Sequence, residues 1–205
     1  MKTLFQLSLL FCCLLGFAQE NTVTQTIERS TSIKPLRIGV RLGMPNLITA
    51  NVEYVTPLLD NRVAATLDYM TLSKTVDGVS IKYNNFEFGT NVYLQNTGKG
   101  LYASLTYFSF KSNGEFEDIE FDDNSTSDGK AQIDFSTINF KVGVKLGRVF
   151  YFRAEVGYGF GKIPEQVIVK SNNSNATSVE DIPNLPGMGS SGTLVYNIGI
   201  GFSIL

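Results

Sequence analysis

Charged side chains recur at alternate positions within apolar stretches of the chain, so that they would share one face of an extended strand. These residues are Arg37, Arg41, Glu53, Arg62, Asp68, Glu87, Lys141, Lys145, Arg153 and Glu155. A carboxylate held away from water can act as a general acid or base, because burial changes its affinity for a proton. Glu53, Glu87 and Glu155 are the candidates for such chemistry.

No catalytic arrangement accompanies these carboxylates. The chain has no histidine, and its two cysteines, Cys12 and Cys13, lie in the first apolar segment. No nucleophile stands beside a base at a diagnostic spacing. Opposite charges in an interior of low dielectric must pair or cost several kcal/mol each. We therefore predict a structural ion-pair network, and neither a catalytic residue nor a cofactor.

A second acidic cluster invites comparison with calcium sites. Its candidate ligands are Glu117, Asp118, Glu120, Asp122, Asp123 and Asp128. The spacing does not match an EF-hand loop, because no Glu stands at the twelfth position from a plausible start. The favoured interpretation is a solvated acidic loop rather than a defined metal site.

The first residues have the form of a secretory signal. Lys2 precedes an apolar stretch from Leu4 to Leu15, and Gly16 and Ala18 are small residues at the positions that a signal peptidase reads. The stretch is shorter than the roughly 20 residues that a membrane-spanning helix needs. We expect a signal peptide over 1–18, a periplasmic tail over 19–34 and one domain over 35–205.

Eight runs in this domain alternate apolar and polar residues with period two, which is typical of strands with two different faces. The runs cover residues 36–43, 48–54, 62–69, 86–94, 101–107, 138–146, 150–160 and 194–204. Phe108 and Phe110 blur the end of the fifth run because they fall on its polar face. The charges listed above all lie on the polar faces. The pattern predicts an all-β, eight-stranded, antiparallel up-and-down sheet.

Two features indicate that the apolar face points outward. Glycines are frequent among the charges of the polar face, and a narrow, crowded interior needs small residues. Aromatic residues also gather near both ends of the apolar face, with aliphatic residues between them. The aromatic residues are Tyr69, Phe86, Tyr107, Tyr158, Phe160 and Tyr196 at one rim, and Tyr54, Phe150, Phe152 and Phe202 at the other.

The lengths of the links between these runs independently support an outward-facing apolar surface. Links over 57–61, 96–100 and 147–148 are short, whereas links over 71–82, 112–132 and 162–192 are long. Short and long links alternate along the chain, apart from the brief link over 43–46. The last link is rich in Asn, Ser, Gly and Pro and is interpreted as flexible. Such alternation is typical of a transmembrane β-barrel.

These runs, the signal ending Gly16-Phe17-Ala18-Gln19 and the final strand from Gly199 to Leu205 resemble the small outer-membrane β-barrels of Bacteroidota. That family is related in architecture to OmpX and to the membrane domain of OmpA. The resemblance implies a place in a Gram-negative outer membrane, among lipid and lipopolysaccharide. The acidic cluster would either repel neighbouring molecules or bridge to lipopolysaccharide through divalent ions.

Three functions remain open on the sequence. The leading hypothesis is a non-enzymatic outer-membrane barrel with a side-chain-filled lumen, whose loops serve a structural or interaction role with a surface or periplasmic protein. A channel or transporter for small solutes is the first alternative. The second is a soluble, lipocalin-like periplasmic barrel that binds an apolar ligand inside. The formal net charge of −2 gives no basic surface for nucleic acid.

Overall fold

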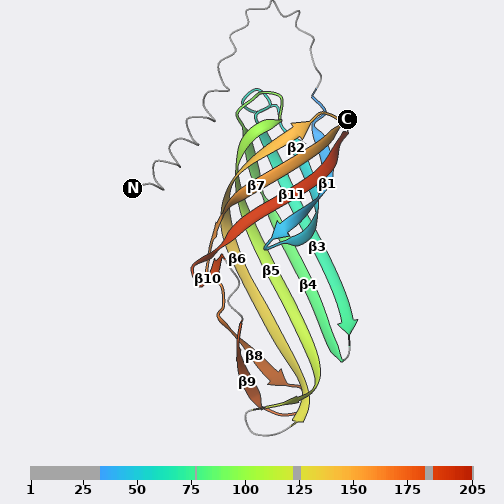
Figure 1. Ribbon diagram of the computed structural model, residues 1–205, viewed down its shortest axis with the longest axis vertical. Coiled ribbons are helices and arrows are strands. Elements are labelled where there is room, and N and C mark those ends of the chain that lie inside the picture. The colour runs from blue at the N-terminus through green and yellow to red at the C-terminus, as the bar shows by residue number, and fades with distance from the viewer. Residues whose placement is uncertain (1–32, 77, 122–125, 183–186, 205) are drawn as a thin grey trace, which may run out of the picture. The chain divides into compact units, whose positions relative to one another are not determined.

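The computed structural model describes residues 33–76, 78–121, 126–182 and 187–204 of the chain (Figure 1). The predicted signal peptide over 1–18 and nearly all of the predicted tail over 19–34 lie outside the described residues. The strands are β1 (Leu36–Met44), β2 (Leu47–Val55), β3 (Val63–Val76), β4 (Val79–Tyr93), β5 (Gly100–Glu120), β6 (Thr126–Gly147), β7 (Phe150–Phe160), β8 (Gln166–Ser171), β9 (Thr177–Asp181), β10 (Met188–Gly189) and β11 (Gly192–Ile204).

Eight of these strands form a closed ring. Each of β1 to β6 pairs with the next strand in antiparallel orientation, and β11 pairs with both β7 and β1. Closure leaves no free strand edge within the ring, so its backbone hydrogen bonds are satisfied internally. The all-β antiparallel architecture and the ring of eight strands agree with the sequence prediction.

The register sorts the side chains of the ring into two sets. Val40 of β1 lies between Ile200 and Ala50, whereas the next residue, Arg41, lies between Gly199 and Thr49. Successive side chains of a strand point to opposite faces, so neighbouring strands in this register keep apolar beside apolar and polar beside polar. Residues of the apolar set are largely exposed and those of the polar set are buried. We call the two sets outward and inward.

Two of the predicted long links are wrong. β3 continues to Val76 and β4 begins at Val79, so most of 71–82 is a hairpin, and β5 and β6 extend through most of 112–132. Pairing runs without a break from Tyr69 opposite Phe86 to Val76 opposite Val79. These segments lack a strict apolar alternation because both of their faces are partly exposed, but backbone pairing still holds them as strands.

The last predicted link, over 162–192, is also more ordered than its composition suggested. It contains β8 and β9, which pair with each other, and the short β10, which pairs with β11. β8 adds to β6 through the pairs Gly129 with Ser171, Lys130 with Lys170 and Ala131 with Val169. β7 pairs with β6 only from Ile138 onward, which leaves the earlier part of β6 free to accept β8.

The strands beyond the ring therefore form a second structural feature. We define the protruding sheet as the described residues of 70–85 and 110–135, together with β8 and β9. Its strand order is β3-β4-β5-β6-β8-β9, and Figure 1 shows the hairpins extending past the ends of β1, β2, β7 and β11. In the described residues, no helix is long and apolar enough to cross a membrane.

Candidate functional site

Glu53 of β2 is the centre of one group of charges inside the ring. Arg37 Nη1 lies 2.7 Å from Glu53 Oε1, and Arg153 Nη1 lies 3.6 Å from Glu53 Oε2. Lys145 Nζ donates to Glu53 Oε1 from β6, and Tyr93 Oη donates to the same oxygen at 2.9 Å. Because β2 and β6 lie on opposite sides of the ring, these contacts cross its interior.

Glu87 of β4 organises a second group nearer to the protruding sheet. Lys141 Nζ lies 2.7 Å from Glu87 Oε1, and Asn139 Nδ2 donates to that oxygen at 3.0 Å. Thr106 Oγ1 also donates to Glu87 Oε1. Asn46, in the link between β1 and β2, donates through Nδ2 to Glu87 Oε2 at 3.2 Å. The hydrogen bond holds this link against the interior of the ring, and Asn46 is buried there.

A third group joins the first two. Glu155 of β7 accepts hydrogen bonds from Arg153 Nη2 at 2.6 Å and from Tyr102 Oη at 2.6 Å. Arg41 Nη1 lies 3.4 Å from Glu155 Oε2 and 2.8 Å from Asp68 Oδ2. The carboxylates in the ring therefore each face at least one cation, as burial requires.

The structure brings together all but one of the charged residues singled out in the sequence. Those that are at most 5% exposed and joined in ion pairs are Arg37, Arg41, Glu53, Asp68, Glu87, Lys141, Lys145, Arg153 and Glu155. Arg62 is the exception, and its assignment to the network was wrong. It is exposed in the turn before β3, because the strand begins one residue later at Val63.

Inward aromatic residues lie toward both ends of the interior. At the end where β1 begins, Tyr93 and Tyr102 pack with ring centroids 5.0 Å apart, beside buried Val55 and Ala64. At the end beside the protruding sheet, the fully buried Phe108 contacts Phe135, with centroids 6.1 Å apart. We call these two groups of inward aromatic residues the aromatic caps; Tyr93 and Tyr102 also donate hydrogen bonds to the ion-pair network.

The same inward aromatics explain the irregular fifth run. Phe110 stacks on Phe135 at 4.8 Å and meets Tyr83 edge-on at 5.1 Å. Phe108 and Phe110 are inward residues that fill space above the charges, rather than exceptions to the alternation. The sequence alone did not assign Tyr93 or Tyr102 to the interior, although Tyr93 has the parity of Glu87 on β4 and Tyr102 has the parity of Thr106 on β5.

The acidic cluster lies mainly on the hairpin of β5 and β6 rather than on a loop. Glu117, Asp118 and Glu120 lie in β5 and Asp128 in β6, whereas Asp122 and Asp123 fall outside the described residues. Asp118 N donates to Asp128 Oδ1 at 3.4 Å. Among the described residues, no group of acidic side chains is arranged to hold a metal ion.

The outward side chains form a continuous apolar belt around the ring. On β6 and β7, for example, Val142 and Val156 are paired neighbours that are each 51% exposed. The belt is repeated on the other strands by Val40, Val52, Leu67, Val92, Leu105 and Ile198. A soluble lipocalin-like barrel needs the opposite arrangement, with apolar residues inside. The structure therefore contradicts that alternative.

Aromatic residues border the belt. At the border with the protruding sheet, Tyr158 and Phe160 pack with centroids 4.9 Å apart, and Phe88 and Tyr107 with centroids 5.6 Å apart. At the opposite border, the centroid of Phe150 lies 5.3 Å from that of Phe202. Because these rings are exposed rather than packed in a core, they belong to the surface of the ring.

Comparisons with known proteins were made by sequence and by fold. A scan against protein families finds no match, and a search of curated proteins finds none either. Among solved structures, the fold is similar to the crystal structure of Acinetobacter baumannii CarO, with a TM-score of 0.43 and 10% sequence identity. That likeness covers 82% of this chain and 97% of the other.

Proposed function

We propose that this chain is an outer-membrane β-barrel with a filled, non-conducting lumen, which holds the protruding sheet at the surface of a Gram-negative cell. The observation that carries the proposal is the apolar belt, which surrounds a buried ionic interior. Large apolar patches on water-soluble monomers rarely exceed a few hundred Å². A belt that encircles the molecule is stable only when hydrocarbon covers it.

The dimensions of the belt support the same environment. A transmembrane strand needs about 9–11 residues when it is tilted by about 45°. Outward apolar residues extend from Phe150 to Phe160 on β7 and from Leu194 to Ile204 on β11, which matches that length. Aromatic residues at both borders correspond to the interfacial girdles of membrane barrels.

The interior supports a structural rather than a catalytic or conducting role. Glu53 contacts Lys145 across the ring, Glu87 contacts Lys141 and Asn46, and the aromatic caps adjoin these contacts. Eight strands enclose an interior just wide enough for side chains to fill. The buried carboxylates are engaged by cations, and the chain has no histidine to serve as a base. We therefore propose no enzymatic activity.

Membrane fractionation and electrophoresis test the placement. A folded outer-membrane barrel resists extraction by salt or alkali and migrates faster on a denaturing gel before heating than after it. Release from membranes without detergent, or a mobility that heating does not change, would refute the proposed location.

Planar-bilayer recording separates the filled barrel from the channel alternative. We expect the purified protein to insert without sustained conductance steps, because the network and caps obstruct the path along the axis. Reproducible open steps that scale with the amount of inserted protein would refute the non-conducting lumen but leave the membrane location intact.

A further inference from the structure

The outward face of the ring continues onto the protruding sheet and changes its chemistry there. On β4 the outward residues run from Phe88 and Phe86 to Lys82 and Ser80. On β6 the corresponding face passes from Ile138 to Gln132 and then to Lys130. If lipid covers the belt, this polar face rises directly beside the headgroups of the outer leaflet.

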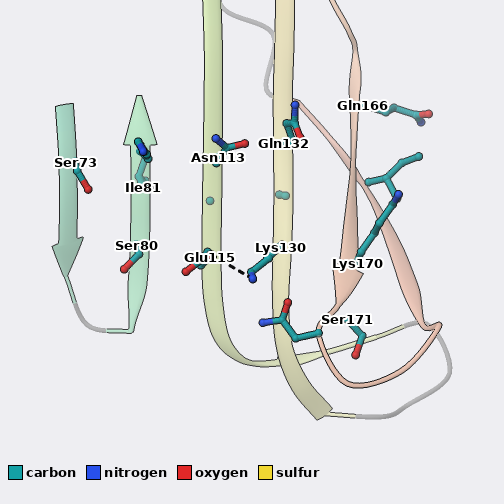
Figure 2. A pocket seen from close by; sticks show the side chains of 15 residues that line it. Ser73, Ser80, Ile81, Asn113, Glu115, Lys130, Gln132, Gln166, Lys170 and Ser171 are labelled. Carbon is teal, nitrogen blue, oxygen red and sulfur yellow. Dashed lines mark ion pairs between the residues drawn. The ribbon is translucent and has the colours of Figure 1, made fainter. Parts of the chain in front are cut away.

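A hollow of about 950 Å³ lies on this polar face. Figure 2 shows Asn113 and Glu115 of β5 next to Gln132 and Lys130 of β6, with Gln166 and Lys170 of β8 on the far side. Lys82 of β4 also lines the hollow. Its walls thus combine cations with side-chain amides that can donate and accept hydrogen bonds.

The cations of the hollow are only partly neutralised. Lys130 Nζ lies 3.4 Å from Glu115 Oε1, and both side chains are more than half exposed, so water screens this pair strongly. Within the described part of the chain, Lys82 and Lys170 have no carboxylate within ion-pair distance. The hollow therefore retains positive charge that an anionic ligand can use.

The register adds an independent reason to expect an anion. Lys130 and Lys170 are directly paired across β6 and β8, and like charges placed opposite each other destabilise a sheet. In the next row, Lys82 is paired with Asn113, which is paired with Gln132. A phosphate beside the lysine pair would offset their repulsion, while the amides reach hydroxyl groups of an attached sugar.

We propose that the hollow binds the phosphorylated sugar headgroup of an outer-leaflet glycolipid. This inference rests on the proposed membrane location, which places acyl chains against Phe86, Tyr107 and Ile138 below the hollow. One lipid molecule then contacts the apolar belt with its tails and the lysines with its phosphates. A soluble sugar phosphate shares the headgroup chemistry but lacks the contacts with the belt.

The test measures retention of a glycolipid by the assembled barrel. Wild-type protein and the triple variant Lys82→Ala/Lys130→Ala/Lys170→Ala are reconstituted in phosphatidylcholine vesicles that contain phosphorylated rough lipopolysaccharide. Each protein is then purified in mild detergent, and bound lipopolysaccharide is counted by native mass spectrometry. Losing several charge-assisted contacts should weaken binding about tenfold or more.

Lys74→Ala provides the matched control. Lys74 is exposed on β3 but has the inward parity, opposite to that of Ser73, which lines the hollow. We expect this variant to retain lipopolysaccharide as the wild type does. Equal losses in the control and the triple variant, or no loss in either, would overturn the proposed site.

Two further arms separate the possible failures. Heat-dependent mobility shows whether each protein assembles as a membrane barrel. A wild-type barrel that assembles but retains no lipopolysaccharide would overturn the glycolipid proposal and leave the proposed membrane location intact. Competition with glucosamine 6-phosphate tests the source of the headgroup. We expect it to displace little lipid, whereas efficient displacement would identify a soluble ligand and contradict the glycolipid assignment.

Discussion

Val142→Arg tests the proposed lipid-facing assignment at a position midway along the apolar belt. Val142 is outward, 51% exposed, and lies between Ala103 of β5 and Val156 of β7. It is four residues from Ile138 and four from Leu146 along β6. At about 3.3 Å per residue and a tilt of about 45°, each end of the belt is about 9 Å away along the membrane normal.

If lipid covers the belt as proposed, Val142 lies near the middle of the hydrocarbon. A cation at the bilayer midplane of a barrel costs about 2–4 kcal/mol, and the cost falls to about 0–1 kcal/mol near the interface. Gln132→Arg is the matched control, because Gln132 has the same parity on the same strand but lies beyond the belt. We expect Val142→Arg to be destabilised by the larger amount and Gln132→Arg by the smaller.

The assay is equilibrium unfolding in urea with phosphatidylcholine vesicles, followed by heat-dependent electrophoretic mobility. The free energy of unfolding comes from the midpoint and slope of each transition. If Val142→Arg unfolds at the same urea concentration as the wild type, hydrocarbon does not cover this face. Equal destabilisation by both arginines would likewise refute the reasoning, because depth would then not matter.

Two other substitutions probe the interior. Glu53→Gln leaves buried cations without their main partner and should lower the free energy of unfolding by about 3–5 kcal/mol in the same assay. The control Glu115→Gln removes a screened surface pair and should lower it by less than about 1 kcal/mol. Similar losses in the two variants would argue against a buried interior around Glu53. Gly157→Ala places a Cβ 2.1 Å from the carbonyl oxygen of Phe140 and should cost about 1–3 kcal/mol through overpacking, while Gly189→Ala, with nothing within 4 Å, should leave the midpoint unchanged. A tolerated Gly157→Ala would show that β6 and β7 do not approach as closely as the structure has them.

Within the ring, the sequence was sufficient to predict strand number, direction and parity. Apolar and polar residues must alternate there, because outward residues such as Val142 are exposed on the apolar belt whereas inward residues such as Lys141 are buried among charges. The parity rule extends to residues that the sequence analysis left unassigned. Tyr93 shares its strand face with Glu87, and Tyr102 shares its face with Thr106.

Beyond the ring this signal fades. Residues such as Ser73 and Lys74 are exposed on both faces of β3, so composition there does not reveal a strand. The pairing of Lys130 with Lys170 depends on β8 returning to β6 after the chain has completed β7. No local pattern encodes that return, which is why the protruding sheet and its hollow emerged only from the three-dimensional structure.

Tryptophan fluorescence tests the orientation of the ring most directly, since the chain has no tryptophan of its own. Ile198→Trp puts one at mid-strand on the outward face of β11, and Gln132→Trp puts one on the outward face beyond the belt. In vesicles of lipid brominated at mid-chain, we predict strong quenching of the first variant and little quenching of the second. An unquenched Ile198→Trp in protein that has assembled would contradict the claim that the apolar belt faces lipid.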